Sequence, residues 1–526
     1  MDLFADSSDE ESPPVTGPAT SSSSSQPPSE KQTLSSDSQS RKRPLVEEKG
    51  KEDGGGPEEQ GPGPKRPRGD SSKDPRLAAA TRAVVVRCRI FASQTVPATA
   101  EDLRNAVGRP ELGDKLEAAV VALQHNDEDA EKCLKIADEV QDAAWKAMLS
   151  DRSTAHRCWK EAFVLSRSMM AAAALALGDV ERCVENADLA FIMGAPKQEV
   201  NLIFRLVAPQ CPAYEDAKVK GVRFPDRAAI EARGFDAGEL RQKLSPGAQI
   251  EPLQGDKEVL DKPSLEDLAK YCLPGDQGRA VVIKGMVDDW PALTTWCDLD
   301  FFVSRYGNRR IPVEIGSRLQ SMKEEVTKLG EFLANYVAPR CRETAENVPA
   351  GEEVAYLAQH NLLEQLPELL RMAPMPRFCA YEGATLDASS VWLGTDETVT
   401  LLHYDSYDNF LIQVAGAKYV VLFDGSQFEE LYVSKGSRSA QSSASTSTSK
   451  DVDEHDGEAF LAQGNTSAVD VGKPDLEKYP KYAKAQGKCV VLQPGDTLYI
   501  PQGMWHYVRS LTPSLSVNYW FSRSSA

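Results

Sequence analysis

Hydrophobic residues recur with two different periods along this chain. Between about Leu77 and Val207 they are spaced three or four positions apart, which is the period of amphipathic helices. Gly178-Asp179 is predicted to end one helix and cap the next, which Gly194 then stops. The positions with helical spacing are Leu116, Val120 and Leu123; Ile136, Val140, Ala144 and Met148; Trp159, Phe163, Ser166 and Met170; and Val180, Val184, Ala187 and Phe191. The pattern therefore predicts an all-α region.

Beyond residue 262 the pattern favours β-strands. Val281–Lys284 is a short apolar run that predicts a strand. Asn409–Val414 and Lys418–Phe423, separated by Ala415-Gly416-Ala417, predict a β-hairpin whose strands have alternating faces. We therefore expect a helical region followed by a region built on β-sheets.

Composition divides the chain into four parts. Residues 1–75 are rich in Ser, Pro, Gly, Glu and Lys, so we expect a disordered tail that cannot bury enough apolar surface to order itself. Residues 76–207 form the helical region, whose paired helices resemble tetratricopeptide-like packing without a clean repeat of about 34 residues. Residues 208–261 are rich in Pro, Gly and charge, which predicts a connecting segment before residues 262–526. Within this last part, residues 434–456 are a low-complexity insertion, predicted to lie in a loop.

Two segments of the C-terminal part together supply two imidazoles and one carboxylate. In an extended strand, positions i and i+2 point to the same side, so His403 and Asp405 can face one cavity while Tyr404 faces away. His506 lies 101 residues after Asp405 (506 − 405) and must arrive from a distant strand. This ligand set is typical of non-haem iron(II) oxygenases, because it leaves three metal positions open for a bidentate co-substrate and O₂. A His-x-Asp pair alone is a weak signal, and the alternative is a chance pair on the surface or in the core.

Lys418 begins a strand that is otherwise apolar. In one interpretation its side chain extends to the rim of the sheet, where the ammonium group reaches water. In the other, the ammonium group is buried and meets a dicarboxylate, because a buried cation is tolerated only with a partner. Thr400 and Asn409 flank the His-x-Asp pair and are candidates for neutral hydrogen bonds to the same anion.

These residues resemble a known family. The runs His403-x-Asp405, Lys418, Pro494-Gly495-Asp496 and Trp505-His506-Tyr507 are similar to motifs of the Jumonji C (JmjC) iron(II)/2-oxoglutarate oxygenases. The resemblance covers about residues 262–524 and includes Val281–Gly285 with Trp290-Pro291, Pro312–Arg318, Ala355–His360, Asn465–Ser467 with Pro474–Lys478, and Leu515–Trp520. Each run is weak alone, but their common order makes the set specific.

The resemblance implies a role for each matching residue. His403, Asp405 and His506 would be the catalytic iron ligands, and Lys418 would pair with the distal carboxylate of 2-oxoglutarate. Further 2-oxoglutarate contacts would come from Tyr356, Thr400 and Asn409. Glu314 and Trp392 would line the substrate side, with Trp520 as an aromatic wall. Two positions depart from the family pattern, because Thr400 replaces a serine and Asn518 stands where a serine is expected.

The predicted fold class is α+β. A C-terminal double-stranded β-helix, the cupin or jelly-roll fold of JmjC proteins, follows the all-α region and the disordered tail. The implied enzyme is a dioxygenase that uses Fe(II), 2-oxoglutarate and O₂ to hydroxylate a protein side chain, with arginine preferred. One alternative is a histone N-methyl-lysine demethylase, although the remaining sequence holds no zinc finger or aromatic-cage chromatin reader. Another alternative is a non-catalytic cupin scaffold. The presence of all three ligands and of the lysine argues against it.

Charge and hydropathy narrow the expected partners. The net charge is −19, from 60 Lys+Arg against 79 Asp+Glu, which disfavours direct nucleic-acid binding and favours a basic protein substrate, either a histone or another arginine-containing protein. No run approaches about 18 apolar residues, so we expect no membrane span. The helical region is a candidate surface for a protein partner. Arg41–Pro44 and Lys65–Arg68 resemble nuclear-import signals, which predicts the nucleus, with the cytoplasm as a second compartment. Alternatively, these clusters only balance acidic neighbours.

Four further histidines are predicted to have structural or solvated roles rather than to bind metal. They are His125, His156, His360 and His455, with His360 placed on a helical stretch.

Overall fold

The computed structural model describes residues 75–523, except for 126–128, 151–155, 273–277, 318–320, 343–352, 382 and 434–464. The predicted tail up to residue 74, its basic clusters and the insertion at 434–456 lie outside the described residues. The division of the chain into four parts stays a prediction.

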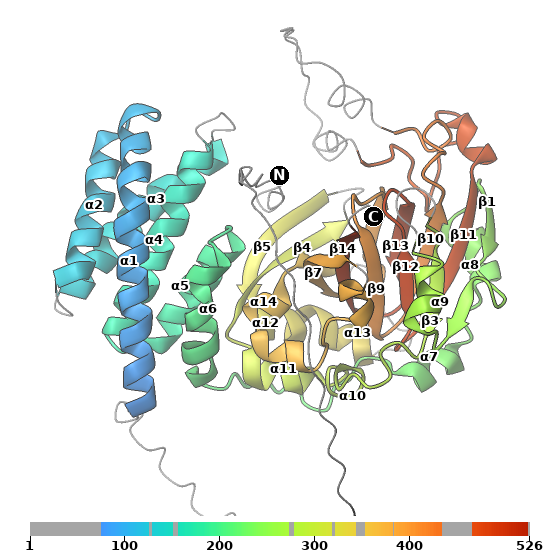
Figure 1. The fold of residues 1–526 in the computed structure, drawn as a ribbon, viewed down its shortest axis with the longest axis horizontal. Helices are drawn as coiled ribbons and strands as arrows, with labels where there is room; N and C mark the ends of the chain where they lie inside the picture. The colour runs from blue at the N-terminus through green and yellow to red at the C-terminus, as the bar shows by residue number, and fades with distance from the viewer. Residues whose placement is uncertain are drawn as a thin grey trace, which may run out of the picture. The chain divides into compact units, whose positions relative to one another are not determined.

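Among the described residues, the region of helical spacing contains six α-helices (Figure 1). They are α1 (Pro75–Asn105), α2 (Pro110–His125), α3 (Ala130–Ser150), α4 (His156–Ala176), α5 (Val180–Ile192) and α6 (Lys197–Leu202). The predicted punctuation is confirmed, because Asp179 accepts a hydrogen bond from the Arg182 backbone N–H at the start of α5. Gly178 and Gly194 adopt positive φ values of 79° and 90°, which glycine tolerates best. Predicted positions such as Val140, Ala144 and Met148 are buried in the shared core.

A fully buried ion pair joins α5 to the C-terminal part. The Arg309 guanidinium donates to both carboxylate oxygens of Asp188, at 2.6 to 3.1 Å, and the two side chains are 4% and 0% exposed. Gln365 donates to the same carboxylate, and the Arg310 backbone N–H does so as well. Because each buried charge has several partners, the charges of this junction are compensated within the chain.

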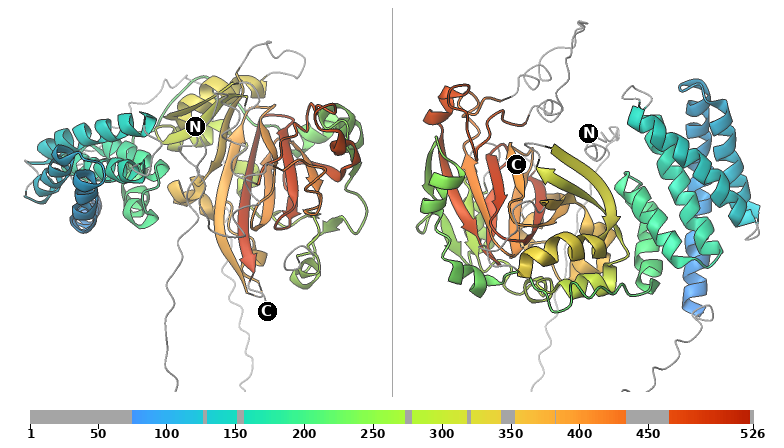
Figure 2. Two further views of the ribbon diagram at one scale, coloured as in Figure 1. Left: turned by 90° about the horizontal axis from the view of Figure 1, so that it is seen from above. Right: turned by 180° about the vertical axis from the view of Figure 1, so that it is seen from behind.

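The C-terminal part is a sandwich of two sheets that contains a double-stranded β-helix, as predicted (Figure 2). Among the described residues, one sheet has the order β1 (Gln249–Pro252), β11 (Gln486–Leu492), β10 (Lys418–Phe423), β13 (Trp505–Ser510) and β8 (Val399–His403). The other has the order β2 (Val259–Asp261), β3 (Val281–Lys284), β12 (Thr497–Ile500), β9 (Asp408–Ala415), β14 (Ser514–Arg523), β7 (Ala384–Gly394), β6 (Ala355–His360), β4 (Arg310–Ser317) and β5 (Ser321–Lys328). Val420 and Leu422 of the first sheet share an apolar cluster with Leu411 and Leu498 of the second, so the two inner faces meet.

Short helices cover the outer face of the larger sheet. They are α9 (Leu265–Ala269), α10 (Ala292–Thr295), α11 (Leu299–Tyr306), α12 (Leu329–Phe332), α13 (Ala338–Arg342) and α14 (Leu362–Gln365). Phe302 of α11 and Phe332 of α12 belong to the same buried cluster as Ile412 and Tyr519 of the sheet. Each such side chain contributes roughly 1.5–3 kcal/mol by leaving water. This packing leaves the inner face of the sheet free to carry polar residues.

The predicted hairpin is wrong. β9 pairs with β12 and β14, whereas β10 pairs with β11 and β13, so the chain crosses from one sheet to the facing one at Gly416. Gly416 has φ +70°, and a Cβ there would lie 2.1 Å from the Pro513 carbonyl oxygen. Both strands are buried along their whole length, so the apolar pattern does not identify their pairing partners.

Residues 208–261, the predicted connecting segment, form short elements that pack onto the sandwich. It contains α7 (Arg227–Arg233) and α8 (Ala237–Leu244), and its strands β1 and β2 pair in parallel with β11 and β3. Arg227 and Lys284 both bind the buried carboxylate of Asp496, at 2.6 and 2.8 Å. Proline and glycine here mark turns between short elements, not an extended linker.

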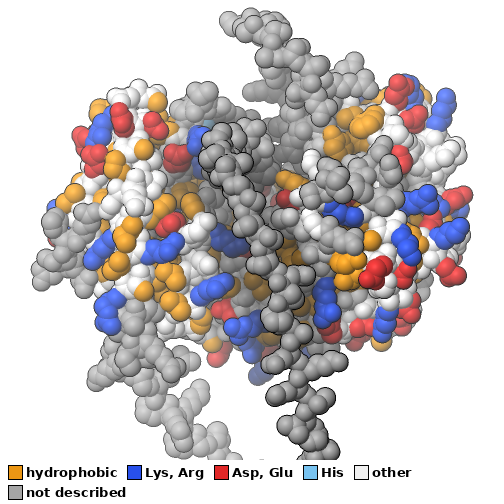
Figure 3. Space-filling model, viewed as in Figure 1, with side chains coloured by type: hydrophobic (Ala, Val, Ile, Leu, Met, Phe, Trp, Pro, Cys, Tyr) orange, Lys and Arg blue, Asp and Glu red, His pale blue; other side chains and the backbone are white. Residues whose placement is uncertain are grey.

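The described surface mixes both signs of charge. On the face in Figure 3, Lys and Arg side chains are interspersed with Asp and Glu side chains. Within the described residues, no helix combines the length and the apolar content needed to cross a bilayer.

Candidate active site

The three predicted ligands lie together at one end of the smaller sheet. His403 is the last residue of β8, and β8 pairs with β13 so that His403 stands opposite His506. Their ring centroids are 4.1 Å apart. Asp405 follows in the turn after β8 rather than within the strand, and ligand atoms of the three residues lie within 4.8 Å of one another. Among the described residues, no further His, Cys, Asp or Glu joins this group.

Hydrogen bonds fix the orientation of both imidazoles. Nδ1 of His403 lies 2.8 Å from the Leu401 carbonyl oxygen, and Nδ1 of His506 lies 3.0 Å from that of Met504. A carbonyl oxygen only accepts, so each Nδ1 carries the proton and each Nε2 keeps its lone pair. These Nε2 atoms face Asp405 at 3.6 and 3.7 Å. Such backbone support of a ligating histidine is typical of metal sites.

The electrostatics of the group suit a divalent cation. Burial, with a smaller contribution from His403, lowers the pKa of His506 to about 4, so its imidazole is neutral near pH 7. Burial alone would raise the pKa of Asp405, but the two imidazoles, Trp520 and Asn409 hold it below its ordinary value. A metal needs deprotonated ligands, and the neutral His506 and the ionised Asp405 provide two of them. Two imidazoles, one carboxylate and open positions fit iron(II).

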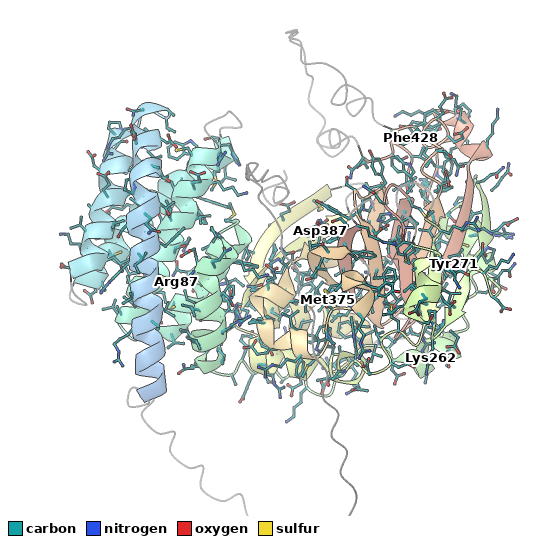
Figure 4. All side chains as sticks on the ribbon, viewed as in Figure 1. Arg87, Lys262, Tyr271, Met375, Asp387 and Phe428 are labelled. Carbon is teal, nitrogen blue, oxygen red and sulfur yellow. The ribbon has the colours of Figure 1, made fainter. Side chains whose placement is uncertain are left out.

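Tyr404 points away from the group, as predicted. Its ring packs 4.9 Å from that of Trp505 and 6.4 Å from that of Phe428, which is 43% exposed (labelled in Figure 4). Both Tyr404 and Trp505 belong to the apolar cluster that includes Tyr419 and Tyr482. The alternation around His403 therefore continues past the end of the strand.

Trp520 has a more direct place than an aromatic wall. Its indole Nε1–H donates to Oδ2 of Asp405 at 2.8 Å, and β14 places it opposite Asn409 of β9. Asn409 also hydrogen-bonds the Asp405 side chain. Both residues therefore orient the carboxylate from the opposite sheet.

Sequence reasoning missed the hydrogen bonds that tie the two ligand-bearing loops together. The Gly503 N–H donates to the Asp405 carbonyl oxygen at 2.9 Å, and the Gln502 side chain donates to the Ser406 carbonyl oxygen at 2.6 Å. The Gln502 N–H and the Tyr499 hydroxyl both donate to Oδ1 of Asp408, at 3.1 and 2.8 Å. Nothing in the sequence distinguishes Gln502 or Asp408 from other polar loop residues.

Lys418 is buried, which rejects the interpretation that it reaches the rim. Its side chain is 1% exposed, and burial lowers the pKa of the ammonium group to about 7. Nζ donates to the Tyr356 hydroxyl at 3.2 Å and lies 5.4 and 6.0 Å from the ring centroids of Tyr356 and Trp392. No carboxylate of the described residues lies within ion-pairing distance of Lys418. An anionic ligand is the partner that this cation lacks.

The remaining predicted residues are divided between the two sheets. Thr400 of β8 stands opposite Val508 of β13. Glu314 of β4 stands opposite Tyr356 of β6, so their side chains share one face of the larger sheet. Trp392 of β7 is on that face too, because its ring lies 5.8 Å from that of Tyr356. The register therefore places Glu314, Tyr356 and Trp392 on one face of the larger sheet, whereas Thr400 belongs to the smaller sheet.

His360 is structural, as predicted, but not helical. It ends strand β6, where a register shift occurs, and Nε2 pairs with Gln365 Oε1 at 2.6 Å. Burial lowers the pKa of its imidazole to about 4, so it stays neutral. Gln365 in turn contacts Asp188, which places His360 in the buried junction with α5.

Comparison with known proteins agrees with this geometry. Residues 276–526 match the model of the cupin-like domain family. Lysine-specific demethylase 8 of Danio rerio is 32% identical over 65% of this chain and 75% of its own length. JmjC domain-containing protein F of Dictyostelium discoideum is 29% identical over 76% of this chain and 89% of its own. The human bifunctional peptidase and (3S)-lysyl hydroxylase JMJD7 is 26% identical over 46% and 77%.

The sandwich and the His-Asp-His group thus define a cupin-like domain with a candidate metal centre. The chain belongs to the JmjC family. Proteins of this family are iron(II)- and 2-oxoglutarate-dependent oxygenases, and this general kind of enzyme extends to the present chain.

Proposed function

We propose that this chain is a dioxygenase that hydroxylates a protein side chain, preferentially arginine, with Fe(II), 2-oxoglutarate and O₂. The observation that carries the proposal is the buried ammonium group of Lys418, which has no carboxylate partner among the described residues and lies on the same face of the smaller sheet as His506. A buried cation beside a candidate metal centre favours an anionic co-substrate that spans both.

Each residue has a defined part in this proposal. His403, Asp405 and His506 would hold the iron, which would supply activation of O₂ coupled to decarboxylation of 2-oxoglutarate to succinate and CO₂. Lys418 binds the distal carboxylate, and Tyr356, Thr400 and Asn409 add neutral hydrogen bonds. The apolar residues of the interior exclude water from the reacting groups.

Arginine is favoured by the side chains beside this pocket. Glu314 offers a carboxylate on the same face as the rings of Tyr356 and Trp392. A guanidinium group is planar, so it can stack on an aromatic ring while it donates a pair of hydrogen bonds to a carboxylate. A trimethylated lysine has no N–H to donate. The proposed substrate is therefore a basic protein, and the nucleus is its proposed location.

Mass spectrometry of peptides incubated with enzyme, iron(II), ascorbate and 2-oxoglutarate tests the proposal. We expect an arginine peptide to gain one oxygen atom in step with succinate. The matched variant Glu314→Gln keeps the side-chain shape and should lose most of this product while iron binding is retained. Formaldehyde release from a methyl-lysine peptide, without oxygen added to arginine, would instead establish demethylation.

A further inference from the structure

Asn518 lies at the centre of a buried hydrogen-bond chain. It belongs to β14, which lies between β7 and β9, and its side chain is 1% exposed. Its Oδ1 accepts from the Trp392 indole Nε1–H of β7 at 2.7 Å. Its Nδ2 donates to Asn409 Oδ1 of β9 at 3.4 Å, and Asn409 hydrogen-bonds Asp405. One amide therefore links the substrate side of the pocket to the candidate metal centre.

The donor-to-acceptor direction of this series of hydrogen bonds is fixed by the groups at its two ends. An indole N–H can only donate, and an ionised carboxylate can only accept. Asn518 must therefore present its oxygen to Trp392 and its nitrogen to Asn409, which leaves the Asn409 nitrogen for Asp405. Since every amide has one chemically consistent orientation, the chain has a single polarity that runs from Trp392 to Asp405.

We propose that Asn518 is a positioning residue that couples the orientation of Trp392 to that of the Asp405 carboxylate. This rests on the proposed function only in taking Asp405 as a metal ligand. The Trp392 ring lies against that of Tyr356 and 6.0 Å from the Lys418 ammonium nitrogen, on the substrate side of the pocket rather than beside the three ligands. A substrate group that docks on this indole is thereby sensed at the metal through Asn518.

The departure from serine at this position has a physical reason. An amide has separate acceptor and donor atoms that diverge from one carbon, so it can reach strands on both sides. A serine hydroxyl is shorter and must serve both partners through one oxygen. Serine at this position would therefore retain at most part of the link between β7 and β9.

The test uses the full chain and measures Mn(II) affinity from the electron paramagnetic resonance signal of free Mn(II). We expect Asn518→Leu, which removes both hydrogen bonds, to weaken Mn(II) binding by about tenfold. Trp392→Phe, which removes only the indole N–H, should weaken it by about threefold. The double variant should bind Mn(II) like Asn518→Leu alone, because both substitutions break one chain.

A matched control separates positioning from general damage to the sheet. Ser516 lies two residues earlier on the same face of β14, is fully buried and donates to Gln413 Oε1 of β9 at 2.7 Å. Ser516→Ala should lower the melting temperature without changing Mn(II) affinity. If Asn518→Leu does not fold, Asn518→Ser takes its place, with an expected Mn(II) affinity between those of Asn518→Leu and wild type.

Two outcomes distinguish the failure of this inference from that of the metal assignment. If wild type does not bind Mn(II), or binds it equally well after Asp405→Ala, Asp405 is not a metal ligand and both fail. If wild type binds through Asp405 but the folded Asn518 variant matches Ser516→Ala, only the role of Asn518 is wrong. Multiplicative effects of Trp392→Phe and Asn518→Leu would likewise overturn the coupling.

Discussion

Two buried cations in this protein have opposite surroundings. Arg309, at the junction between α5 and β4, is 3% exposed and donates to both oxygens of the Asp188 carboxylate. Lys418, inside the sandwich, is 1% exposed and contacts the hydroxyl and ring of Tyr356 and the ring of Trp392. Arg309 is neutralised within the chain, whereas Lys418 has a depressed pKa of about 7. A closed network fixes a fold, but an uncompensated buried charge marks a place for a ligand.

The largest expected effect concerns the His-Asp-His group. We expect His403→Ala, Asp405→Ala or His506→Ala each to abolish succinate production, because two remaining ligands neither retain iron nor orient its open positions. His156→Ala on helix α4 is the control for loss of an imidazole and should keep wild-type turnover. Wild-type succinate production by any of the three at limiting iron would contradict the assignment.

Breaking the buried ion pair between Asp188 and Arg309 should cause the largest loss of stability. Asp188→Ala leaves the Arg309 guanidinium buried without its counter-charge, so we expect a loss of about 3–5 kcal/mol in the free energy of unfolding. Glu185→Ala is the matched control on the same helix, since Glu185 pairs with Arg310 at 2.7 Å, but both side chains are partly exposed. Its expected cost is about 0–1 kcal/mol. If chemical denaturation gave equal losses of unfolding free energy for the two variants, the Asp188–Arg309 pair would not be the buried, mutually compensated pair described above.

Replacing Lys418 with an apolar residue should stabilise the protein, whereas Asp188→Ala should destabilise it. The folded-state pKa of Lys418, about 7, is below its ordinary value of 10.5, so the unfolded chain binds more protons between these values. The penalty is complete below about pH 7 and disappears as pH rises towards 10.5. Lys418→Met should therefore raise the free energy of unfolding of the ligand-free protein at pH 7 by a few kcal/mol, on the order of the measured gains when buried charges are replaced. Denaturation at pH 7 and pH 10 checks this, and a gain that does not shrink at high pH would contradict it.

The sequence predicted those features whose chemistry resides in residue type. His403, Asp405 and His506 could be chosen because only a few side chains bind iron, and Asp179 because its carboxylate caps a helix. The strand partners of β9 and β10 could not be predicted from the sequence. Both strands are buried along their whole length, so they lack the alternation of apolar and polar residues that would indicate which face is covered. The bond from Trp520 to Asp405 depends on β14 lying beside β9, which is long-range information.

The other missed residues are polar side chains with unremarkable neighbours in sequence. Asp408 and Gln502 matter because two loops meet, and that meeting follows from the sheet order rather than from a local pattern. Asn518 was singled out only as a departure from a family motif. Its two partners became visible once β14 was placed between β7 and β9. Residue type thus identifies groups that react, whereas register identifies groups that orient them.

The smallest expected effect is the uptake of a proton by Lys418 when 2-oxoglutarate binds. At pH 8 most Lys418 side chains in the free protein are neutral, because their pKa is about 7, but a bound dicarboxylate favours the ammonium form. Binding of 2-oxoglutarate should therefore take up close to one proton per site at pH 8 and almost none at pH 6. Calorimetry in two buffers of different ionisation enthalpy measures this uptake, with Lys418→Met as the variant that cannot show it. Above pH 7 the dissociation constant for 2-oxoglutarate should rise by up to about tenfold per pH unit, which is about 1.4 kcal/mol. Binding that releases protons, or does not depend on pH between 6 and 9, would show that the ammonium group is already charged in the free protein and that its partner lies within the chain.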